Sequence, residues 1–335
     1  MKNLLYIGNA LSNSSSTVTT IETLSEHLKE AFSVKVASDK SNKVLRLLDM
    51  IRLVIVNRGT TDFVLIDTYS TINFYYALII SQLCRFYRIK YVTILHGGNL
   101  ESRLKHSSKL SNLLFKNAYK LVAPSNFLKS VFKSYGYKDV VFIPNSIEID
   151  NYQFLNRNVD TINLLWVRSF STIYNPELAV LVLEKLLEKQ YNAQLTMIGP
   201  DVDGSLKRVK ELAKSKQLNV NFTGKLSKPA WLELSKNSNI FINTTDLDNT
   251  PVSVIEAMAL GLPIVSTNVG GLPFLITDNV NGLLVEPKNA DAMVDAIILL
   301  KSKEDMRKKI VVNARSMVED FTWKAVKPKW EALLS

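Results

Sequence analysis

Short apolar runs rich in β-branched residues alternate with helical patterns along nearly all of the 335 residues. The expected strands of the first half are LLYIG, FSVKVA, DFVLIDT, KYVTILHG, KLVAPS and VVFIPN; those of the second half are INLLWVR, QLTMIG, NVNFTG, NIFINT and PIVST. Helices are expected between the first six strands, over residues 17–31, 42–57, 71–87, 100–117 and 126–135. This alternation predicts an α/β chain, because short connections between such elements are typical of parallel sheets covered on both faces.

A chain of this length is expected to form two domains, each with its own core. The boundary is expected within IEIDNYQFLNRNVDTIN, which lacks periodicity and carries several turn-forming residues. The expected domains are Rossmann-like, over residues 1–153 and 154–320, with a helical tail over 321–335. Two open α/β domains are expected to face each other across a cleft at the C-terminal ends of their strands.

The segment DLDNTPVSVIEAMALGLPIVS, residues 246–266, places two carboxylates around a predicted helix start. Asp248 and Glu256 stand eight positions apart, and Pro251 between them suits the first turn of a helix. Gly261 fits the end of that helix. Free N–H groups at a helix start bind phosphate, and carboxylates accept hydrogen bonds from sugar hydroxyls. The arrangement therefore suits a sugar joined to a diphosphate.

This segment resembles the acidic pair of retaining nucleotide-sugar glycosyltransferases, the family-four type with two Rossmann-like domains (the GT-B fold). The pattern there is Glu, seven residues, Glu, then Ala-Met-Ala and a Gly-x-Pro run; here Asp248 replaces the first Glu. The alternative is an ordinary buried helix and strand. The resemblance extends from YVTILHG to NGLLVEP and is strongest between Gly224 and Val285. It implies that the tail, residues 321–335, crosses back onto the first domain.

The resemblance also implies a cationic grip on the diphosphate. In the family, a strand such as INLLWV ends in Gly-Arg, and a lysine follows about six residues later. Arg168 occupies the arginine position, but Val167 stands at the glycine and Tyr174 at the lysine. A guanidinium suits phosphate because its fork of donors matches phosphate oxygens. The alternative for Arg168 is a surface arginine at a strand end.

Other site residues follow from the same resemblance. His96 ends the strand YVTIL and is expected to approach the donor sugar; otherwise it is a structural histidine. In FTGKL, the position two residues after the glycine reads the nucleotide base through its backbone, which points to Leu226. The remaining expected donor contacts are Lys225, Tyr174, Asn249, Thr250, Pro251 and Val252.

The first strand is followed by GNALSNSSST, which departs from the paired glycines common in the family. Gly8, Ser15 and Ser16 are the candidate acceptor-loop residues. Two interpretations remain open. The serines hydrogen-bond an acceptor, or Ser16 is simply a helix N-cap.

Two Asp-x-Asp triplets, Asp201 to Asp203 and Asp246 to Asp248, invite a metal interpretation. The first, in DVDG, also fits a turn and helix cap, which is the preferred interpretation. The sequence has no His/Cys cluster, no Gly-x-Ser-x-Gly, no phosphate loop ending in Gly-Lys-Ser/Thr and no Gly-x-Gly-x-x-Gly. We therefore expect no metal and no cofactor, with the nucleoside-diphosphate sugar acting as a substrate.

The positive charge of the chain is concentrated in its first half. Residues 1–150 hold 19 Lys and Arg against 11 Asp and Glu, and residues 102–138 hold eight basic and no acidic residues. On one helix, Lys105, Lys109 and Lys116 would fall within about 40° of one another. They form either a solvated face or a surface that meets an anionic membrane or acceptor. No motif or aromatic ladder supports nucleic-acid binding.

Cysteine usage and the N-terminus suggest where the chain works. Cys84, the single cysteine, lies in an apolar run and is expected to be an inert core thiol. The run is too short to span a bilayer, and the N-terminus does not resemble a signal peptide. We expect a cytoplasmic protein, with peripheral contact at the inner face of the membrane.

The expected activity is transfer of a sugar, with retention, from a nucleoside-diphosphate sugar to a glycan or lipid-linked hydroxyl in polysaccharide or glycoconjugate synthesis. The alternatives are a nucleotide-sugar epimerase or sugar phosphorylase of the same fold, a sugar-binding protein, and a catalytically silent relative. The altered first loop and Tyr174 make the silent relative credible.

Overall fold

The chain divides into two compact units in a computed structural model that describes residues 1–11, 19–97 and 99–335. The first unit comprises Met1–Ile147 and Phe321–Ser335, and the second comprises Glu148–Asp320. The tail therefore belongs to the first unit. The second unit begins six residues before the boundary expected from the sequence. The reason is that Tyr152 is held there, by hydrogen bonds from its hydroxyl to Glu256 and from Arg315 to its carbonyl oxygen.

The first unit is built on a six-stranded parallel sheet with the order β2-β1-β3-β4-β5-β6. Its strands are β1 (Asn3–Ile7), β2 (Ser33–Ala37), β3 (Phe63–Thr68), β4 (Lys90–Leu95), β5 (Lys120–Ala123) and β6 (Val140–Phe142). All adjacent strands pair in parallel. The residues of β3 are all buried, as expected for a strand covered on both faces.

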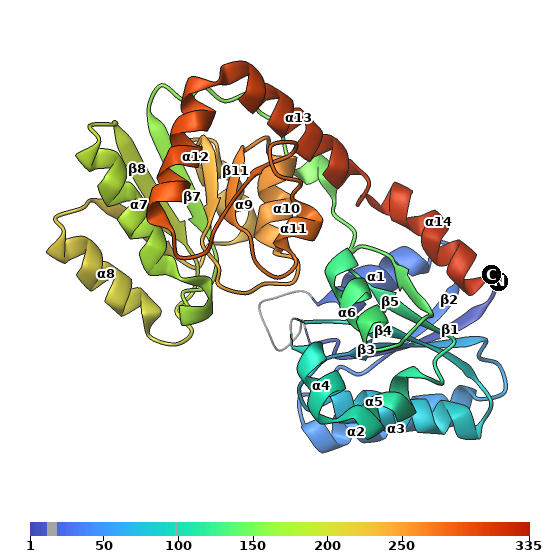
Figure 1. The fold of residues 1–335 in the computed structure, drawn as a ribbon. Coiled ribbons are helices and arrows are strands. Elements are labelled where there is room, and N and C mark those ends of the chain that lie inside the picture. The colour runs from blue at the N-terminus through green and yellow to red at the C-terminus, as the bar shows by residue number, and fades with distance from the viewer. Residues whose placement is uncertain (12–18, 98) are drawn as a thin grey trace. The chain divides into compact units, whose positions relative to one another are not determined.

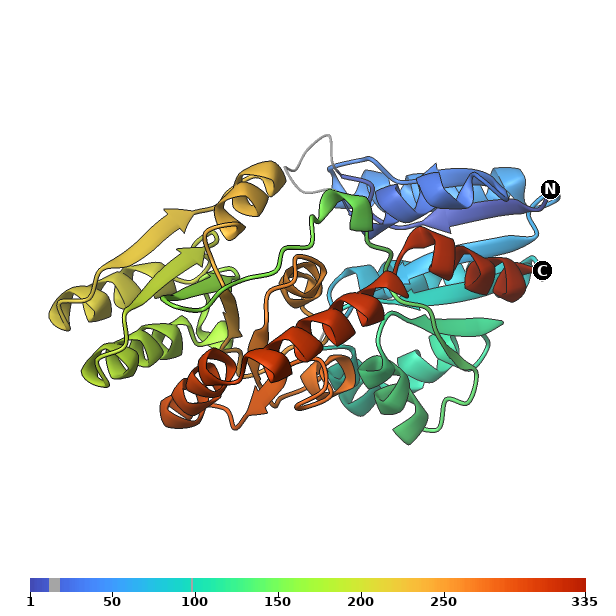
Figure 2. The ribbon, with the colours of Figure 1, turned by 90° about the horizontal axis from the view of Figure 1, so that it is seen from above.

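Helices cover both faces of this sheet (Figure 1). They are α1 (Thr20–Leu28), α2 (Lys43–Asn57), α3 (Asn73–Phe86), α4 (Leu100–His106), α5 (Ser108–Phe115), α6 (Asn126–Ser134) and α14 (Trp323–Leu334). One core contains buried residues of α2, α3 and α5, and a second contains those of α1 and α14. The tail helix α14 thus packs on the face that α1 covers, and both chain termini lie at that end of the unit (Figure 2).

The second unit repeats the plan with the order β12-β11-β10-β7-β8-β9, again parallel throughout. Its strands are β7 (Ile162–Val167), β8 (Ala193–Ile198), β9 (Val220–Gly224), β10 (Ile240–Asn243), β11 (Ile264–Thr267) and β12 (Leu283–Val285). Its helices are α7 (Pro176–Glu188), α8 (Ser205–Ser215), α9 (Lys228–Ser235), α10 (Val252–Ala259), α11 (Leu272–Leu275), α12 (Ala290–Ser302) and α13 (Glu304–Glu319). The predicted α/β class with two Rossmann-like domains is confirmed.

Each strand order contains one point where the chain reverses its direction of progress across the sheet. In the first unit, β1 lies between β2 and β3; in the second, β7 lies between β10 and β8. In open α/β sheets, ligands bind beyond the carboxyl ends of the strands at such a switch point. We therefore expect ligand-binding residues directly after β1 and β3 in the first unit, and directly after β7 and β10 in the second.

One predicted helix is wrong. Residues 100–117 form two helices, α4 and α5, because Ser107 has φ −129° and ψ 41°, outside the helical region. The hydroxyl of Ser111 donates to the Arg103 carbonyl, an example of a serine side chain competing for the helix backbone. Lys105 and Lys109 consequently lie on different helices, and their calculated alignment on a single helix does not hold.

Among the described residues, no helix combines the length and the apolar character that crossing a bilayer requires.

Candidate functional site

The switch point of the second unit holds an ion pair. Arg168 follows β7 directly, and its Nη2 contacts Oδ2 of Asp248, which lies in the loop after β10. Both side chains are largely buried, at 17% and 13% exposure. The Arg168 guanidinium lies 4.2 Å from the centre of the Tyr174 ring. Burial lowers the pKa of Arg168, and the contact with Tyr174 partly offsets this. Tyr174 thus offers an aromatic face, without charge, at the position of the family's lysine.

Glycines allow the close backbone packing behind this pair. A Cβ at Gly199 would lie 1.7 Å from the Arg168 carbonyl oxygen, and a Cβ at Gly271 would lie 1.6 Å from the Asn249 carbonyl oxygen. The Gly271 amide also donates to the Asp248 carbonyl oxygen at 2.9 Å. Neither glycine was predicted from the sequence to position the site. The consecutive glycines after the strand PIVST were the available signal.

Helix α10 begins beside the ion pair. Pro251 is its N-cap, with φ −69° and ψ 116°, whereas the sequence analysis placed it in the first turn. Val252 is the first helical residue, and Asn249 and Thr250 form the loop before it. The hydroxyl of Ser253 and Nε of Arg168 are buried without a hydrogen-bond partner in the described part of the chain. Unsatisfied buried polar atoms are rare in folded proteins, and these two point to a ligand that would satisfy them.

Glu256, the second acid of the motif, is buried on α10. Its Oε1 accepts a hydrogen bond from the Tyr152 hydroxyl at 2.9 Å and also contacts Lys228 Nζ. The Lys228 ammonium lies 5.5 Å from the ring centres of both Tyr152 and Trp231. Neither Tyr152 nor Lys228 was predicted from the sequence. Lys228 stands two residues after Leu226, but Tyr152 is 104 positions from Glu256 and no local pattern reveals it.

The expected base-reading segment lies between β9 and α9. Gly224 ends β9 with φ 71°, a left-handed conformation that favours glycine. Lys225 is exposed and Leu226 is half-buried, and Ser227 is the N-cap of α9. Lys225 and Leu226 therefore lie in the short connection at the carboxyl end of β9, and Lys228 begins α9 directly after it.

His96 lies in the first unit, where it is held by a residue that the sequence analysis missed. Its Nε2 is 2.7 Å from Oδ1 of Asp67, the penultimate residue of β3. The Tyr6 hydroxyl donates to the same oxygen at 2.9 Å, and the Tyr69 ring stacks on the imidazole with centroids 4.7 Å apart. Burial, followed by the charge of Asp67, raises the pKa of Tyr6 well above its usual value. The available sequence signal for Asp67 was that it is the single acidic residue at the end of the apolar strand FVLIDT.

Gly8 also belongs to this first-unit cluster. A Cβ at Gly8 would lie 2.5 Å from Oδ2 of Asp67, so a larger residue would displace that carboxylate. Ser15 and Ser16, the other two acceptor-loop candidates, lie outside the described residues.

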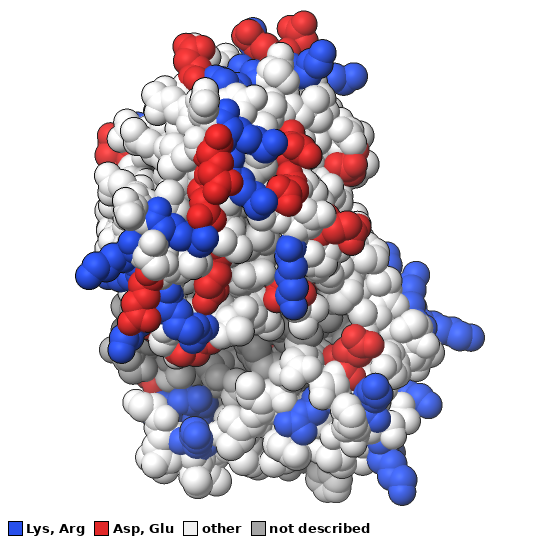
Figure 3. All heavy atoms as spheres, turned by 60° about the vertical axis from the view of Figure 1, so that its left-hand side comes forward, with Lys and Arg blue, Asp and Glu red and all other residues white. Residues whose placement is uncertain are grey.

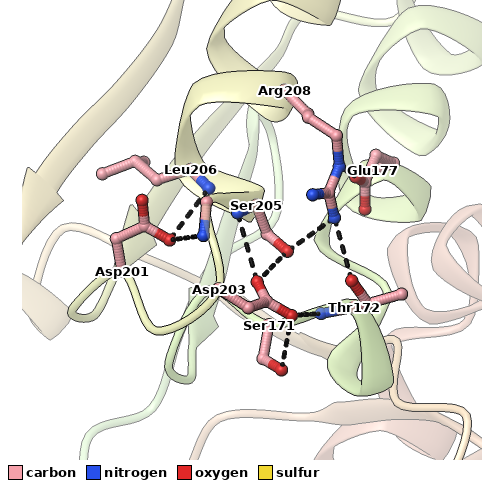
Figure 4. A network of polar contacts seen from close by, with 9 residues as sticks. Ser171, Thr172, Glu177, Asp201, Asp203, Ser205, Leu206 and Arg208 are labelled. Atoms are coloured by element: carbon pink, nitrogen blue, oxygen red, sulfur yellow. Dashed lines mark hydrogen bonds and ion pairs between the residues drawn. The ribbon is translucent and has the colours of Figure 1, made fainter.

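The first Asp-x-Asp triplet caps a helix (Figure 4). Asp201 Oδ1 accepts hydrogen bonds from the backbone amides of Gly204 and Leu206, while Asp203 Oδ1 accepts from Ser205. Asp203 Oδ2 accepts from the Thr172 amide and the Ser171 hydroxyl. The hydrogen bonds, chiefly the one from Ser205, lower the pKa of Asp203. The described residues contain no group of three or more His, Cys, Asp or Glu side chains arranged to hold a metal ion.

With this geometry established, comparison with known proteins identifies the family. The sequence profile of the family described as "Glycosyl transferases group 1" matches residues 148–317, about half of the chain. The chain belongs to this family and has the GT-B fold.

Curated relatives agree with this assignment. Two uncharacterized glycosyltransferases of Methanocaldococcus jannaschii are 24% and 26% identical over 242 and 264 residues, which is 70% and 72% of this chain. The alignments span 65% and 66% of those relatives, just under two thirds of their length. N-acetyl-alpha-D-glucosaminyl L-malate synthase of Bacillus anthracis is 24% identical over 271 residues, covering 73% of this chain and 68% of the relative.

Solved structures share the fold along the whole chain. HepE of Anabaena, crystallised in complex with UDP, superposes with a TM-score of 0.76, 16% identity and 99% coverage of both chains. Sucrose-phosphate synthase of Thermosynechococcus elongatus superposes with a TM-score of 0.80 and 16% identity, covering 99% of this chain and 98% of the other.

Proposed function

We propose that the chain is a retaining glycosyltransferase that moves a sugar from a nucleoside-diphosphate sugar to a hydroxyl of a glycan or lipid-linked acceptor, in polysaccharide or glycoconjugate synthesis. The observation that carries the proposal is the Arg168–Asp248 pair at the β7/β10 switch point, beside the start of α10. The complexes of HepE with UDP and UDP-glucose support a nucleotide-sugar donor.

The donor would lie along the edge formed by β7, β9 and β10. The backbone at Leu226 would meet the base, and Glu256 would accept hydrogen bonds from the ribose hydroxyls. Arg168 and the first amides of α10 would hold the diphosphate, since cations and helix N-termini both favour phosphate. Asp248 would accept from hydroxyls of the transferred sugar. The unpartnered Arg168 Nε and Ser253 hydroxyl would then gain hydrogen bonds from the bound donor.

The reaction breaks the bond between the anomeric carbon and the β-phosphate oxygen, and the electron pair leaves with the nucleoside diphosphate. The acceptor oxygen forms the new bond to the same carbon, on the face from which the leaving group departs, and its proton passes to the leaving phosphate oxygen. Arg168 stabilises the charge that develops on the diphosphate. Stabilising charge that appears only in the transition state is what accelerates the reaction.

No metal or organic cofactor is assigned to this reaction. In the two Asp-x-Asp triplets, Asp201 and Asp203 accept hydrogen bonds from backbone amides at the start of α8 and at Thr172, and Asp248 pairs with Arg168. Charge stabilisation would therefore come from Arg168 and the first amides of α10. Tyr174 leaves the site one cation short of the family pattern. A catalytically silent relative that binds the donor without transferring it is therefore the second candidate.

The acceptor would meet the first unit, near Gly8, His96 and the loop that carries Ser15 and Ser16. His96 would approach the donor sugar. The protein would act in the cytoplasm, peripherally at the inner face of the membrane that carries the acceptor.

Donor turnover tests this proposal. The purified protein is incubated with each common nucleoside-diphosphate sugar, with and without a membrane extract as acceptor, and release of nucleoside diphosphate is measured. Acceptor-dependent release and an α-linked product from an α-linked donor support a retaining transferase. Acceptor-independent conversion of the donor sugar points to an epimerase, dependence on free phosphate to a phosphorylase, and binding without turnover to the silent relative.

A further inference from the structure

The first unit exposes a cluster of large apolar side chains on three helices. Of the twenty large hydrophobic residues exposed in the described part of the chain, nine come from α2, α3 with its N-cap, and α5. They are Val44, Leu45, Leu48, Val56, Ile72, Tyr75, Ile79, Phe86 and Leu113. Scattered exposed apolar residues are ordinary, but a gathered set is not.

The three helices form one layer. Helix α3 contacts both α2 and α5, and all three helices lie on the same face of the sheet in Figure 1. Met50 and Val54 of α2 are buried against the sheet, while Leu48 and Val56 on the opposite side are 54% and 67% exposed. Phe86, at the end of α3, is 78% exposed. The outer side of this layer therefore carries apolar residues where a solvated helix normally carries polar ones.

Positive charge surrounds these residues. Helices α2, α3 and α5 contain one acidic residue, Asp49, and the neighbouring helix α4 contains one more, Glu101. Five exposed cations on or beside the layer form no ion pair with any described residue; they are Lys43, Arg52, Lys105, Lys109 and Lys116. The lowest part of Figure 3, where Figure 1 places this layer, shows blue side chains separated by broad white areas.

The division into units sharpens the charge asymmetry. The first unit holds 22 Lys and Arg against 10 Asp and Glu, and the second holds 19 against 21. The excess of twelve positive charges thus belongs to the unit with the apolar layer, and the unit with the proposed donor site is close to neutral.

We propose that the outer side of α2, α3 and α5 is a docking surface for an anionic lipid bilayer. The apolar residues would enter the boundary between headgroups and acyl chains, while Lys and Arg reach anionic headgroups with their charged ends. A protein that docked on a surface with so few acidic residues would itself have to be strongly acidic. The combination of apolar and basic residues therefore favours a membrane over a protein partner. This surface rests on the proposed function, for which it would be the membrane contact. Apolar residues of α2 and α3 would contribute to that contact in addition to Lys105, Lys109 and Lys116.

Flotation with vesicles tests the proposal without donor or acceptor, so that its failure is distinguishable from failure of the transferase assignment. The full chain is mixed either with vesicles of pure phosphatidylcholine or with vesicles that contain equal amounts of phosphatidylcholine and phosphatidylglycerol. Three proteins are compared with the native chain. The first carries Leu45→Gln, Leu48→Gln and Phe86→Gln; the second carries Lys105→Gln, Lys109→Gln and Lys116→Gln; the third, a matched control, carries Leu187→Gln, Val202→Gln and Val312→Gln at exposed positions of the second unit.

The native chain is expected to bind the anionic vesicles and to bind phosphatidylcholine far more weakly. The apolar triple variant should lose at least about tenfold in partitioning at low and high salt alike, because transfer of apolar surface is not screened by salt. The lysine variant should lose roughly fivefold for each lysine that reaches the surface, and added salt should reduce the difference from the native chain. The control should bind as the native chain does.

Three outcomes would overturn the proposal. The native chain does not float with anionic vesicles, the apolar variant floats as well as the native chain, or the control loses as much binding as the apolar variant. A native dimer on size exclusion that the apolar variant converts to a monomer, with vesicle binding unchanged, would assign the surface to a second copy of the chain. Donor hydrolysis in solution should be the same in all four proteins.

Discussion

The imidazole of His96 and the carboxylate of Asp67 are paired inside the first unit, with Nε2 and Oδ1 2.7 Å apart. The two residues come from adjacent parallel strands, since Asp67 is the penultimate residue of β3 and His96 follows β4. Both are almost fully buried, at 5% and 6% exposure. The carboxylate fixes the ring orientation through Nε2, so Nδ1 is the nitrogen left for other partners.

Replacing Asp67 by Asn should impair catalysis through His96. The amide removes the charge that orients the imidazole, and a buried hydrogen bond to a charged group is worth roughly 1.5–3 kcal/mol. We expect kcat/KM to fall about 10–100-fold. His96→Ala should cost as much, and the double variant should cost little more than either single variant. Additive losses in the double variant would show that the two residues act separately.

The buried Tyr6 hydroxyl should make the first unit sensitive to alkaline pH. Its pKa is raised above the usual value of 10.0, first by burial and then by Asp67. Below pH 10 both folded and unfolded states keep the proton, so the stabilisation is fully present. Above pH 10 the unfolded chain releases the proton and the folded chain keeps it, so the free energy of unfolding falls.

Urea unfolding between pH 9.5 and 11 measures this effect. In Tyr6→Phe the fall with pH should be shallower by up to about 1.4 kcal/mol per pH unit, the contribution of one proton. Tyr91→Phe is a useful comparison, because burial also raises the pKa of Tyr91 but no carboxylate bonds its hydroxyl. Identical slopes in Tyr6→Phe and the native chain would mean that Tyr6 keeps its ordinary pKa.

Arg168 should matter far more than Tyr174. Arg168→Ala removes the cation proposed to meet the leaving diphosphate, and loss of one such donor costs about 100–1000-fold in kcat. Tyr174→Phe keeps the ring beneath the guanidinium and should cost less than about fivefold. Tyr174→Lys should retain activity and tighten binding of the nucleoside diphosphate. Arg208→Ala, at an exposed arginine of α8, is the control. Intact turnover in a folded Arg168→Ala protein would place the leaving group elsewhere.

Glu256→Gln should weaken donor use more than folding. The carboxylate is held by Tyr152 and Lys228, and the amide oxygen can still accept from one of them. Loss of a charge-assisted bond to the ribose should lower kcat/KM about 10–100-fold. Glu233→Gln on the exposed side of α9 is the matched control. Full donor kinetics in the folded Gln variant, measured over a range of donor concentrations, would remove Glu256 from the site.

The fold was accessible from the sequence because buried parallel strands read as apolar runs. The exceptions have physical reasons. Strand β12, Leu283–Val285, was not predicted, because its apolar run LLV is short and is bounded by Gly282 and Glu286, whereas the equally short β6 lies in the longer apolar run VVFI. The break at Ser107 depends on side-chain competition for backbone groups, which periodicity does not register.

The candidate site was accessible only where its residues are close together in the chain or fit the family motif. Asp248 and Glu256 share one segment, and Arg168 follows a recognisable strand. Tyr152 contacts Glu256 from outside that motif, and Asp67 contacts His96 from the neighbouring strand. Such partners are set by tertiary packing, and a single sequence does not specify it.

Thermal shift with nucleoside diphosphates tests the central claim most directly. At about 100 times its Kd, a ligand that binds the folded chain alone stabilises it by about 2.7 kcal/mol. We predict that one nucleoside diphosphate raises the Tm of the native chain and of Arg208→Ala, and that the rise is lost in Arg168→Ala and reduced in Glu256→Gln. No shift with any nucleoside diphosphate, or an equal shift in Arg168→Ala, would contradict a donor site at the β7/β10 switch point.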